Sequence, residues 1–193
     1  MRAMVVFSHP VPESFSAALH QKVVKTLSAR GWEVDDCDLY AEGFDPVLSC
    51  VERRGYHDVG PNLDPVAPYV ERLRAAQALV FVFPVWNFGY PAMLKGFFDR
   101  CFLPGVSFEL VNGKVAPALT HITRLAAVTT YGGTRLRAVM AGDPPRHVVK
   151  RAVRFVVNRN AKMKYLALYD MNRAEEAKRA AFLARVGAEM ERL

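Results

Sequence analysis

Short apolar runs rich in Val, Phe and Ala alternate with amphipathic stretches along almost the whole chain. The runs predict buried strands, and the helical spacing of the apolar residues between them predicts helices. Strands that alternate with helices pair in parallel through right-handed crossovers and carry helices on both faces of the sheet. The pattern therefore predicts an α/β protein with a doubly wound, five-stranded parallel sheet in the order 2-1-3-4-5.

The elements can be placed from their periods and their end signals. Ser14 is positioned as a helix N-cap, Gly31 as a helix stop, and Asn112-Gly113 as a type I′ hairpin turn. Segment 39–65 has no sustained period, which favours a functional loop or short helices. The expected strands are 2–7, 32–38, 78–83, 124–130 and 164–169, the expected helices 14–27, 66–76, 91–103, 144–158 and 174–192, and the expected hairpin 107–115.

Five strands in 193 residues fit a flavodoxin-like arrangement, and no repeat or linker divides the chain. We expect one domain over residues 1–193. Apolar residues make up 51% and charged residues 23%, which is ordinary globular usage. The three cysteines form no C-x-x-C pair, which argues against disulfides or a metal site and fits a reducing cytoplasm. The start lacks a signal-peptide pattern and no apolar stretch is long enough for membrane insertion, so we expect a soluble cytoplasmic protein.

The net charge of +7 is unevenly distributed. Residues 1–123 carry 11 basic and 13 acidic side chains, whereas residues 124–193 carry 15 basic and 6 acidic ones. A basic half attracts nucleic acid, an anionic membrane or phosphorylated small molecules; the alternative is a solvated surface that keeps the protein in solution. No DNA- or RNA-binding motif accompanies the basic half, so no nucleic-acid partner is expected.

Three unusual segments follow predicted strands, where ligands of such sheets bind. The first, residues 9–16, leads from a strand into a helix whose free N–H groups, with Ser14 and Ser16, favour an anion. Helix capping by Ser14 alone would also explain the segment. It has neither G-x-G-x-x-G nor a P-loop, so a Rossmann dinucleotide site and a nucleoside triphosphatase are not supported.

The second and third segments suit a flat ligand. Trp86, Phe88 and Tyr90 lie in a loop and can form an aromatic wall, whereas Phe97, Phe98 and Phe102 have helical spacing and are expected in the core. Lys95 and Arg100 are expected to be solvated helix charges. The third segment, T-T-Y-G-G-T, has paired glycines that let backbone N–H groups approach a ligand oxygen, although an ordinary turn explains them equally well. Together the three segments suggest a bound flavin.

Four collinear motifs over residues 3–133 carry a family resemblance: H-P-V-P-E-S-F-S-A-A-L, D-L-Y-A-E-G-F-D-P-V-L-S, F-P-V-W-N-F-G-Y-P-A-M-L-K-G-F-F-D-R and T-T-Y-G-G. The chain resembles the flavodoxin-like NAD(P)H:quinone oxidoreductases, the family of DT-diaphorase and smaller bacterial relatives. The resemblance implies a tightly bound flavin, usually FAD and in some members FMN, and a homodimer with its sites at the interface. The segment 43–64, with Tyr56 and Val59 expected to be exposed, is a candidate partner contact.

The resemblance also implies roles for individual residues. Asn87 replaces the family's tryptophan, which here stands one position earlier as Trp86. The tyrosine and histidine that follow the family's glycine pair have no clear counterparts, and Tyr131 and His147 are the candidate catalytic substitutes. The implied flavin-binding residues are His9, Ser14, Phe15, Ser16 and Ala18 at the phosphates, Pro84, Val85, Trp86, Asn87 and Phe88 along the ring, and Thr129, Thr130, Tyr131, Gly132 and Gly133 at the ring edge.

The leading hypothesis is an enzyme, a flavin-dependent NAD(P)H:acceptor oxidoreductase of the NAD(P)H dehydrogenase (quinone) type. NADPH or NADH would donate a hydride to the flavin and leave, and a quinone or similar flat acceptor would then bind at the same site. A shared site predicts ping-pong kinetics. Arg135 and Arg137 are the candidates to meet the 2′-phosphate of NADPH. The alternatives are a flavin-binding regulatory subunit of a membrane potassium-efflux transporter and an electron carrier, although flavodoxins are typically acidic.

Overall fold

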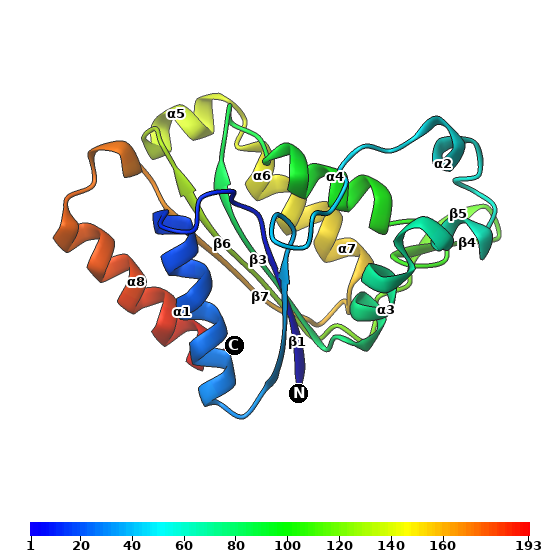
Figure 1. Cartoon of the computed structure of the whole chain (residues 1–193), viewed down its shortest axis with the longest axis horizontal. Coiled ribbons are helices and arrows are strands. Elements are labelled where there is room, and N and C mark those ends of the chain that lie inside the picture. The colour runs from blue at the N-terminus through cyan, green and yellow to red at the C-terminus, as the bar shows by residue number, and fades with distance from the viewer.

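The computed structural model describes all residues from 1 to 193 and has a central five-stranded parallel sheet. Its order, β2-β1-β3-β6-β7, is the predicted 2-1-3-4-5 order, and Figure 1 shows the strands side by side with their carboxyl ends at the top. The five predicted strands are thereby confirmed, with small shifts at their ends. They are β1 (Arg2–Phe7), β2 (Glu33–Asp38), β3 (Ala78–Val85), β6 (Arg124–Tyr131) and β7 (Lys162–Leu168).

Helices cover both faces of the sheet, as Figure 1 shows. One face carries α1 (Phe15–Ala29) and α8 (Glu176–Glu191), which pack side by side. The other face carries α3 (Ala67–Ala75), α4 (Ala92–Cys101), and the continuous run α6 (Pro144–His147), η2 (Val148–Val153) and α7 (Arg154–Val156). The remaining short helices are α2 (Cys50–Arg54), η1 (Pro61–Val66), α5 (Arg135–Met140) and η3 (Met171–Arg173).

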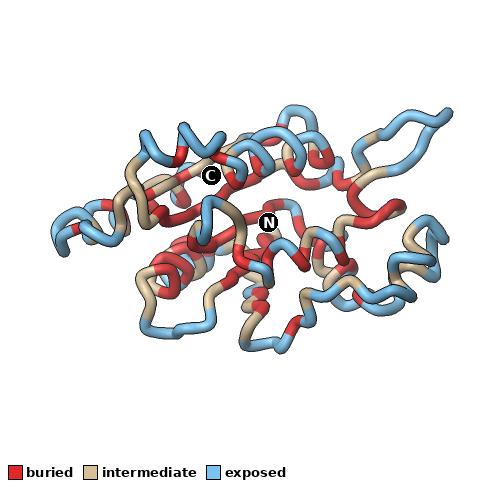
Figure 2. The backbone as a smooth tube through the Cα atoms, turned by 90° about the horizontal axis from the view of Figure 1, so that it is seen from above, coloured by how far each residue is buried: buried red, intermediate tan, exposed pale blue.

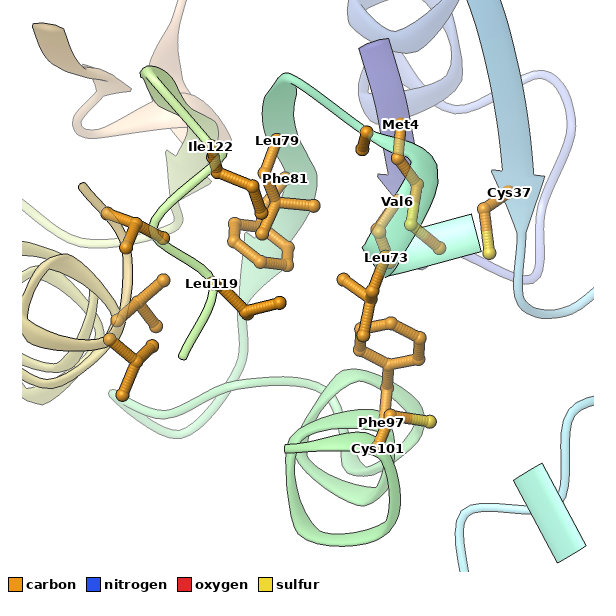
Figure 3. Packing of buried hydrophobic residues seen from close by; sticks show 14 of the residues in the cluster. Met4, Val6, Cys37, Leu73, Leu79, Phe81, Phe97, Cys101, Leu119 and Ile122 are labelled. Carbon is orange, nitrogen blue, oxygen red and sulfur yellow. The ribbon is translucent and has the colours of Figure 1, made fainter. Parts of the chain in front are cut away.

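The sheet separates two hydrophobic cores, because successive side chains of a strand point to opposite faces. In β1, Met4 and Val6 enter a core of 26 buried residues beneath α3 and α4, and Val5 enters a core of 19 beneath α1 and α8. Figure 2 shows this burial concentrated along the middle of the molecule. In Figure 3, Phe97 and Cys101 of α4 project toward the sheet in the larger core, which confirms the core role expected of Phe97.

The predicted end signals are also confirmed. Ser14 caps α1, and its Oγ accepts a hydrogen bond from the Ala17 N–H at 3.1 Å. Gly31 follows α1 with a φ of 76°. The hairpin consists of β4 (Phe108–Val111) and β5 (Lys114–Pro117), joined by Asn112 and Gly113 with φ values of 51° and 73°. Both values lie in the left-handed region that a type I′ turn requires.

Two helical features between residues 135 and 158 were not predicted. The expected helix 144–158 contains six residues in π-helical geometry, η2, between its two α-helical ends. A π-segment shifts the apolar period for only one turn, so the sequence shows no clear sign of it. The helix α5 was missed because its six residues are too short for a period, and most of its side chains are exposed.

The expectation that Arg100 is a solvated charge is wrong. Its side chain is 9% exposed, and its Nη2 lies 2.7 Å from Glu52 Oε1. Ser49 and Glu52 form a capping box at the start of α2, and Arg100 Nη1 also donates to the Asp45 carbonyl oxygen. We call this set of contacts the loop clasp. It fixes segment 43–64 against α4, and the segment holds the short helices α2 and part of η1.

Candidate functional site

Two adjoining hollows lie at the carboxyl ends of β1, β3 and β6. Their volumes are about 420 and 310 Å³. Val85, Asn87, Gly132 and Asn172 line both, so the two hollows form one continuous depression, which we call the ligand cavity. The three segments expected at this rim from the sequence meet here, although they are far apart along the chain.

The first segment gives the cavity a set of hydrogen-bond donors. His9, Ser14 and Ser16 line it beside the N-terminus of α1. The Val11 N–H donates to His9 Nδ1 at 3.0 Å, and partial burial lowers the pKa of His9. Since Nδ1 accepts this hydrogen bond, the proton of the ring lies on Nε2, which leaves an N–H free for a ligand. These donors and the positive end of the helix dipole suit a phosphate.

The second segment forms a strained turn at the cavity. The Trp86 and Gly89 backbones exchange hydrogen bonds of 3.2 and 2.8 Å, and Asn87 and Phe88 between them have φ values of 49° and 57°. This is type I′ geometry, in which asparagine is common but phenylalanine is not. The turn leaves the rings of Trp86 and Phe88 at the cavity, 40% and 43% exposed. They offer an apolar wall to a planar ligand.

Tyr90 does not belong to this wall. Its hydroxyl donates to the Pro145 carbonyl oxygen at 2.5 Å, and its ring packs against Phe83 and Phe98. It lines a separate apolar groove between α4 and the α6–η2–α7 run.

The third segment contributes backbone. Gly132 lines both hollows, and a Cβ atom there would lie 3.0 Å from Asn172 Nδ2. The glycine therefore permits a close approach of η3 to the segment that follows β6. Gly133 and Thr130 also line the cavity, on opposite sides of Tyr131 in the sequence. The exposed backbone here can meet the polar edge of a ligand ring without an intervening side chain.

Tyr131 is the centre of a buried hydrogen-bond network. Its hydroxyl donates to Asp143 Oδ1 at 2.5 Å and lies 2.7 Å from the Tyr165 hydroxyl. Tyr131 is 2% exposed and Asp143 5%. Burial, followed by the neighbouring Tyr165 and Asp143, raises the pKa of Tyr131 far above its usual value. The phenol is thus a fixed donor within the protein that holds β6 to α6.

Most of the candidate residues line the ligand cavity, and three do not. Ala18 lies one turn into α1, outside it. Thr129 is completely buried, and its Oγ1 has no hydrogen-bond partner. It neighbours Thr130 in β6 and so points to the opposite face. His147 is exposed at the end of α6, in a different hollow. The residues brought together are His9, Ser14, Phe15, Ser16, Pro84, Val85, Trp86, Asn87, Phe88, Thr130, Tyr131, Gly132 and Gly133.

Five further residues that line the cavity were not among the expected flavin-binding residues: Thr134, Arg137 and Ala138, which begin or belong to α5, and Met171 and Asn172 in η3. Arg137 was expected to meet the 2′-phosphate of NADPH rather than to line the flavin site. The η3 residues follow the last strand, and the rule that ligands bind at the carboxyl ends of strands could have identified them.

Other reactive groups lie away from the cavity. No cluster of side chains has the composition of a metal site, and all three cysteines are free. Cys37 and Cys101 are buried in the larger core, and burial raises the pKa of the Cys101 thiol to about 12. These two thiols are therefore poor nucleophiles. None of the helices has the length and apolar character needed to cross a membrane.

Comparisons with known proteins agree with the observed topology. The family model described as "Flavodoxin-like fold" matches residues 1–191. Rat NAD(P)H dehydrogenase [quinone] 1 is 30% identical over 147 residues, which cover 68% of this chain and 54% of that protein. The uncharacterized NAD(P)H oxidoreductase YcaK of Escherichia coli is 30% identical over 108 residues, 55% of each chain. The chain thus spans about half the length of these curated relatives.

Solved structures extend the likeness over the whole chain. Smu.1420 from Streptococcus mutans superposes with a TM-score of 0.87 at 27% identity and covers all of both chains. NAD(P)H:quinone oxidoreductase from Methanothermobacter marburgensis, at 24% identity and a TM-score of 0.83, has the same fold over 99% of this chain and 98% of its own. Since the family model spans nearly every residue and the strand order is the one expected, this chain belongs to the family with the flavodoxin-like fold.

Proposed function

We propose that this protein is a flavin-dependent NAD(P)H:acceptor oxidoreductase that reduces quinones or similar flat acceptors. The ligand cavity carries the proposal, because it joins phosphate-type donors at one end to an aromatic wall and open backbone at the other. The rat relative is named as a quinone dehydrogenase and the Escherichia coli relative as an NAD(P)H oxidoreductase, and both names support the same class.

The residues present fit a flavin. His9, Ser14 and Ser16 would bind its phosphate, as their free donors and the start of α1 suggest. Trp86 and Phe88 would lie along its ring, and the Gly132 backbone would meet the ring's polar edge. The two hollows have room for FMN, and FAD would extend its adenosine beyond them; the family resemblance favours FAD.

A bound flavin would supply two-electron exchange with both substrates. The protein would supply position and electrostatics. Backbone N–H groups at Gly132 and Gly133 would stabilise negative charge at the ring edge without reorganising, since the segment is fixed from below by the Tyr131–Asp143 hydrogen bond. The aromatic turn would limit the access of water and leave one open side, so donor and acceptor would use the same place in turn.

The assembly and its location complete the proposal. We propose a homodimer, with the exposed valines of segment 43–64 among the partner contacts, and a cytoplasmic location, where reducing conditions would keep the thiols free.

Purification and anaerobic titration test this function. We expect a yellow protein whose colour is bleached by NADPH or NADH and restored by a quinone. Heat release of the cofactor followed by chromatography will distinguish FAD from FMN. Double-reciprocal plots should be parallel, and intersecting lines would contradict the shared place. A colourless protein without flavin affinity would overturn the proposal.

A further inference from the structure

A further hollow, of about 250 Å³, lies on the side of α5 that faces away from the ligand cavity. We call it the basic pocket. It is lined by Arg135, Val139, Gly142, Asp143, Arg146 and His147. It belongs to the most basic part of the chain, since residues 135–164 contain nine Lys or Arg and one acidic residue, Asp143.

The two arginines of the basic pocket have no carboxylate partner. None of the ion pairs in the structure involves Arg135 or Arg146. Arg146 is nevertheless held in place, because its guanidinium lies 5.3 Å from the centre of the Tyr165 ring and Nη1 donates to the Tyr169 hydroxyl at 3.3 Å. An ordered guanidinium with free N–H groups is well suited to a phosphate, whose oxygens match its planar fork.

The single carboxylate in the basic pocket is already engaged. Asp143 is buried, and its Oδ1 accepts the Tyr131 hydroxyl at 2.5 Å. Its charge offsets one arginine, so the two arginines leave the basic pocket with a net positive charge. His147 Nδ1 donates to the Gly142 carbonyl oxygen at 2.9 Å.

The basic pocket and the ligand cavity share a wall. Tyr131 lines the cavity and Asp143 lines the basic pocket, and these two residues are in direct contact. The helix α5 also faces both, with Arg137 on the cavity side and Arg135 on the other. A ligand whose ring occupies the cavity can therefore reach the basic pocket by passing over a single short helix.

We propose that the basic pocket binds the phosphomonoester of the hydride donor, the 2′-phosphate that distinguishes NADPH from NADH, through Arg135 and Arg146. This inference rests on the proposed function, because it assigns the donor of that reaction. It makes Arg135 and Arg146 specificity-determining residues, with Arg137 closer to the ring end of the same ligand.

Direct binding to the flavin-loaded protein tests the basic pocket without turnover. Adenosine 2′-monophosphate, adenosine and inorganic phosphate are titrated separately by calorimetry. We expect adenosine 2′-monophosphate to bind more tightly than either of the others. Arg135→Ala and Arg146→Ala should each weaken that binding by about tenfold or more, the loss expected for a hydrogen bond to a charged group. Arg135 is exposed and has no partner in the protein, so its variant tests the basic pocket even if Arg146→Ala disturbs packing on Tyr165.

Steady-state kinetics provide the second measurement. The ratio of kcat/KM for NADPH to that for NADH should fall by a similar factor in both variants. It should also fall in the parent as salt rises, because 0.1 M salt screens exposed charges beyond about 10 Å. Arg146→Lys should restore only part of the ratio, since lysine keeps the charge but not the fork. Arg185→Ala, an exposed site in α8 on the other face of the sheet, is the matched control and should leave the ratio unchanged.

Three results would overturn the inference. A ratio unmoved by salt and by both substitutions would make these arginines ordinary surface charges. If inorganic phosphate binds as tightly as adenosine 2′-monophosphate and the NADPH-to-NADH ratio is unchanged in the variants, the basic pocket is a general anion site. Loss of binding in the Arg185→Ala control would indicate non-specific attraction. If no nicotinamide reduces the bound flavin, the proposed function fails, and arginine-dependent binding of adenosine 2′-monophosphate then decides the basic pocket separately.

Discussion

At the scale of single residues, Tyr131 shows how one hydroxyl can hold a site together. Its O–H satisfies a buried carboxylate, Asp143, that has few other partners. Tyr131→Phe removes the donor and leaves the acceptor buried, so we expect a loss of about 1–3 kcal/mol of stability. Urea unfolding measures it. Tyr40→Phe is the control, since the Tyr40 hydroxyl is only partly buried and has no hydrogen-bond partner in the protein.

The Tyr131→Phe variant also tests the proposed structural role of Tyr131. If Tyr131→Phe retains full stability and flavin, the network does not fix the segment after β6, and our reading of Tyr131 as a holding residue is wrong. A variant that keeps its stability but loses turnover would return Tyr131 to the catalytic role expected from the sequence.

Phe88 carries the clearest backbone strain at the site. A non-glycine residue in the left-handed region costs about 1–2 kcal/mol, and the type I′ turn would accept glycine at this position. Phe88→Gly should raise the stability by about 1 kcal/mol relative to Phe88→Ala, which keeps the strain but also lacks the ring. Both should retain less flavin than the parent, as measured by absorbance after gel filtration.

The two outcomes separate strain from function. Equal stability of the glycine and alanine variants would show that the turn is unstrained. Full flavin content in both variants, and in Trp86→Ala, would show that the aromatic wall is ordinary packing and that the flavin lies elsewhere.

At the scale of elements, α4 and segment 43–64 fit together through Gly96. A Cβ atom there would lie 2.3–2.4 Å from the Pro46 carbonyl oxygen, Cα and Cβ. Gly96→Ala must push backbone apart, so we expect it to cost about 1–3 kcal/mol, as overpacking usually does. In Gly187→Ala, by contrast, the nearest atom is the flexible end of Lys22, and alanine favours the helix by about 1 kcal/mol.

Thermal unfolding of both alanine variants checks this contrast. We expect a lower Tm for Gly96→Ala and an equal or higher Tm for Gly187→Ala. Equal shifts in the two would mean that segment 43–64 moves freely and that the loop clasp does not hold it.

The loop clasp should also make stability depend on pH. Burial alone would raise the pKa of Glu52, but hydrogen bonds from Ser49 and Arg100 outweigh it and leave the pKa below its usual 4.5. Because the pKa of Glu52 is lower in the folded state than in the unfolded state, the loop clasp stabilises the fold above about pH 4.5. This stabilisation is lost as the pH falls through the lowered pKa.

Glu52→Gln tests the sign of this effect. Its urea midpoint should lie below that of the parent at pH 7 and approach it as the pH falls from 5 toward 3. Glu13→Gln, at an exposed site without an ion pair, should follow the parent throughout. A constant difference between Glu52→Gln and the parent would show that the carboxylate charge contributes nothing.

The elements also show where sequence reasoning works and where it ends. Strong periods and end signals, such as Ser14 before α1 and Asn112-Gly113 in the hairpin, gave elements that the structure confirms. The burial of Arg100 could not be predicted, because its partner Glu52 lies 48 residues away in the sequence. Tyr56 was expected to be exposed, but it is half-buried against the larger core. Its burial also depends on contacts that form only when segment 43–64 has folded.

The candidate site divides in the same way. Residues next to strand ends could be collected from the sequence, because the topology brings those ends together. Successive residues of a strand face opposite sides of the sheet, however, so Thr130 lines the cavity while Thr129 points away from it and is buried. The contribution of η3 was missed because Asn172 has no motif, and its role depends on the absence of a side chain at Gly132.

At the scale of the whole molecule, segment 43–64 leaves three valines uncovered. Val47, Val51 and Val59 are 67%, 77% and 63% exposed. We expect a dimer in light scattering at micromolar concentration, since two-fold dimers are the commonest oligomers and apolar exposure is typical of an interface. Val51→Glu should shift the protein toward monomer, whereas Leu136→Glu, at an exposed position of α5 far from this segment in Figure 1, should not. A monomeric parent would contradict the proposed homodimer.

The strand order has an electrical consequence. Strands β2, β1 and β3 lie at one side of the sheet and β6 and β7 at the other, so much of the uneven charge of the sequence becomes a separation in space. The nearly neutral side carries β2, and the strongly positive side carries β7. Such a molecule has a large permanent dipole moment, and an electric field or a negatively charged surface will turn it before it makes contact. Adsorption to a cation exchanger should therefore hide the β7 edge and leave segment 43–64 open to a protease.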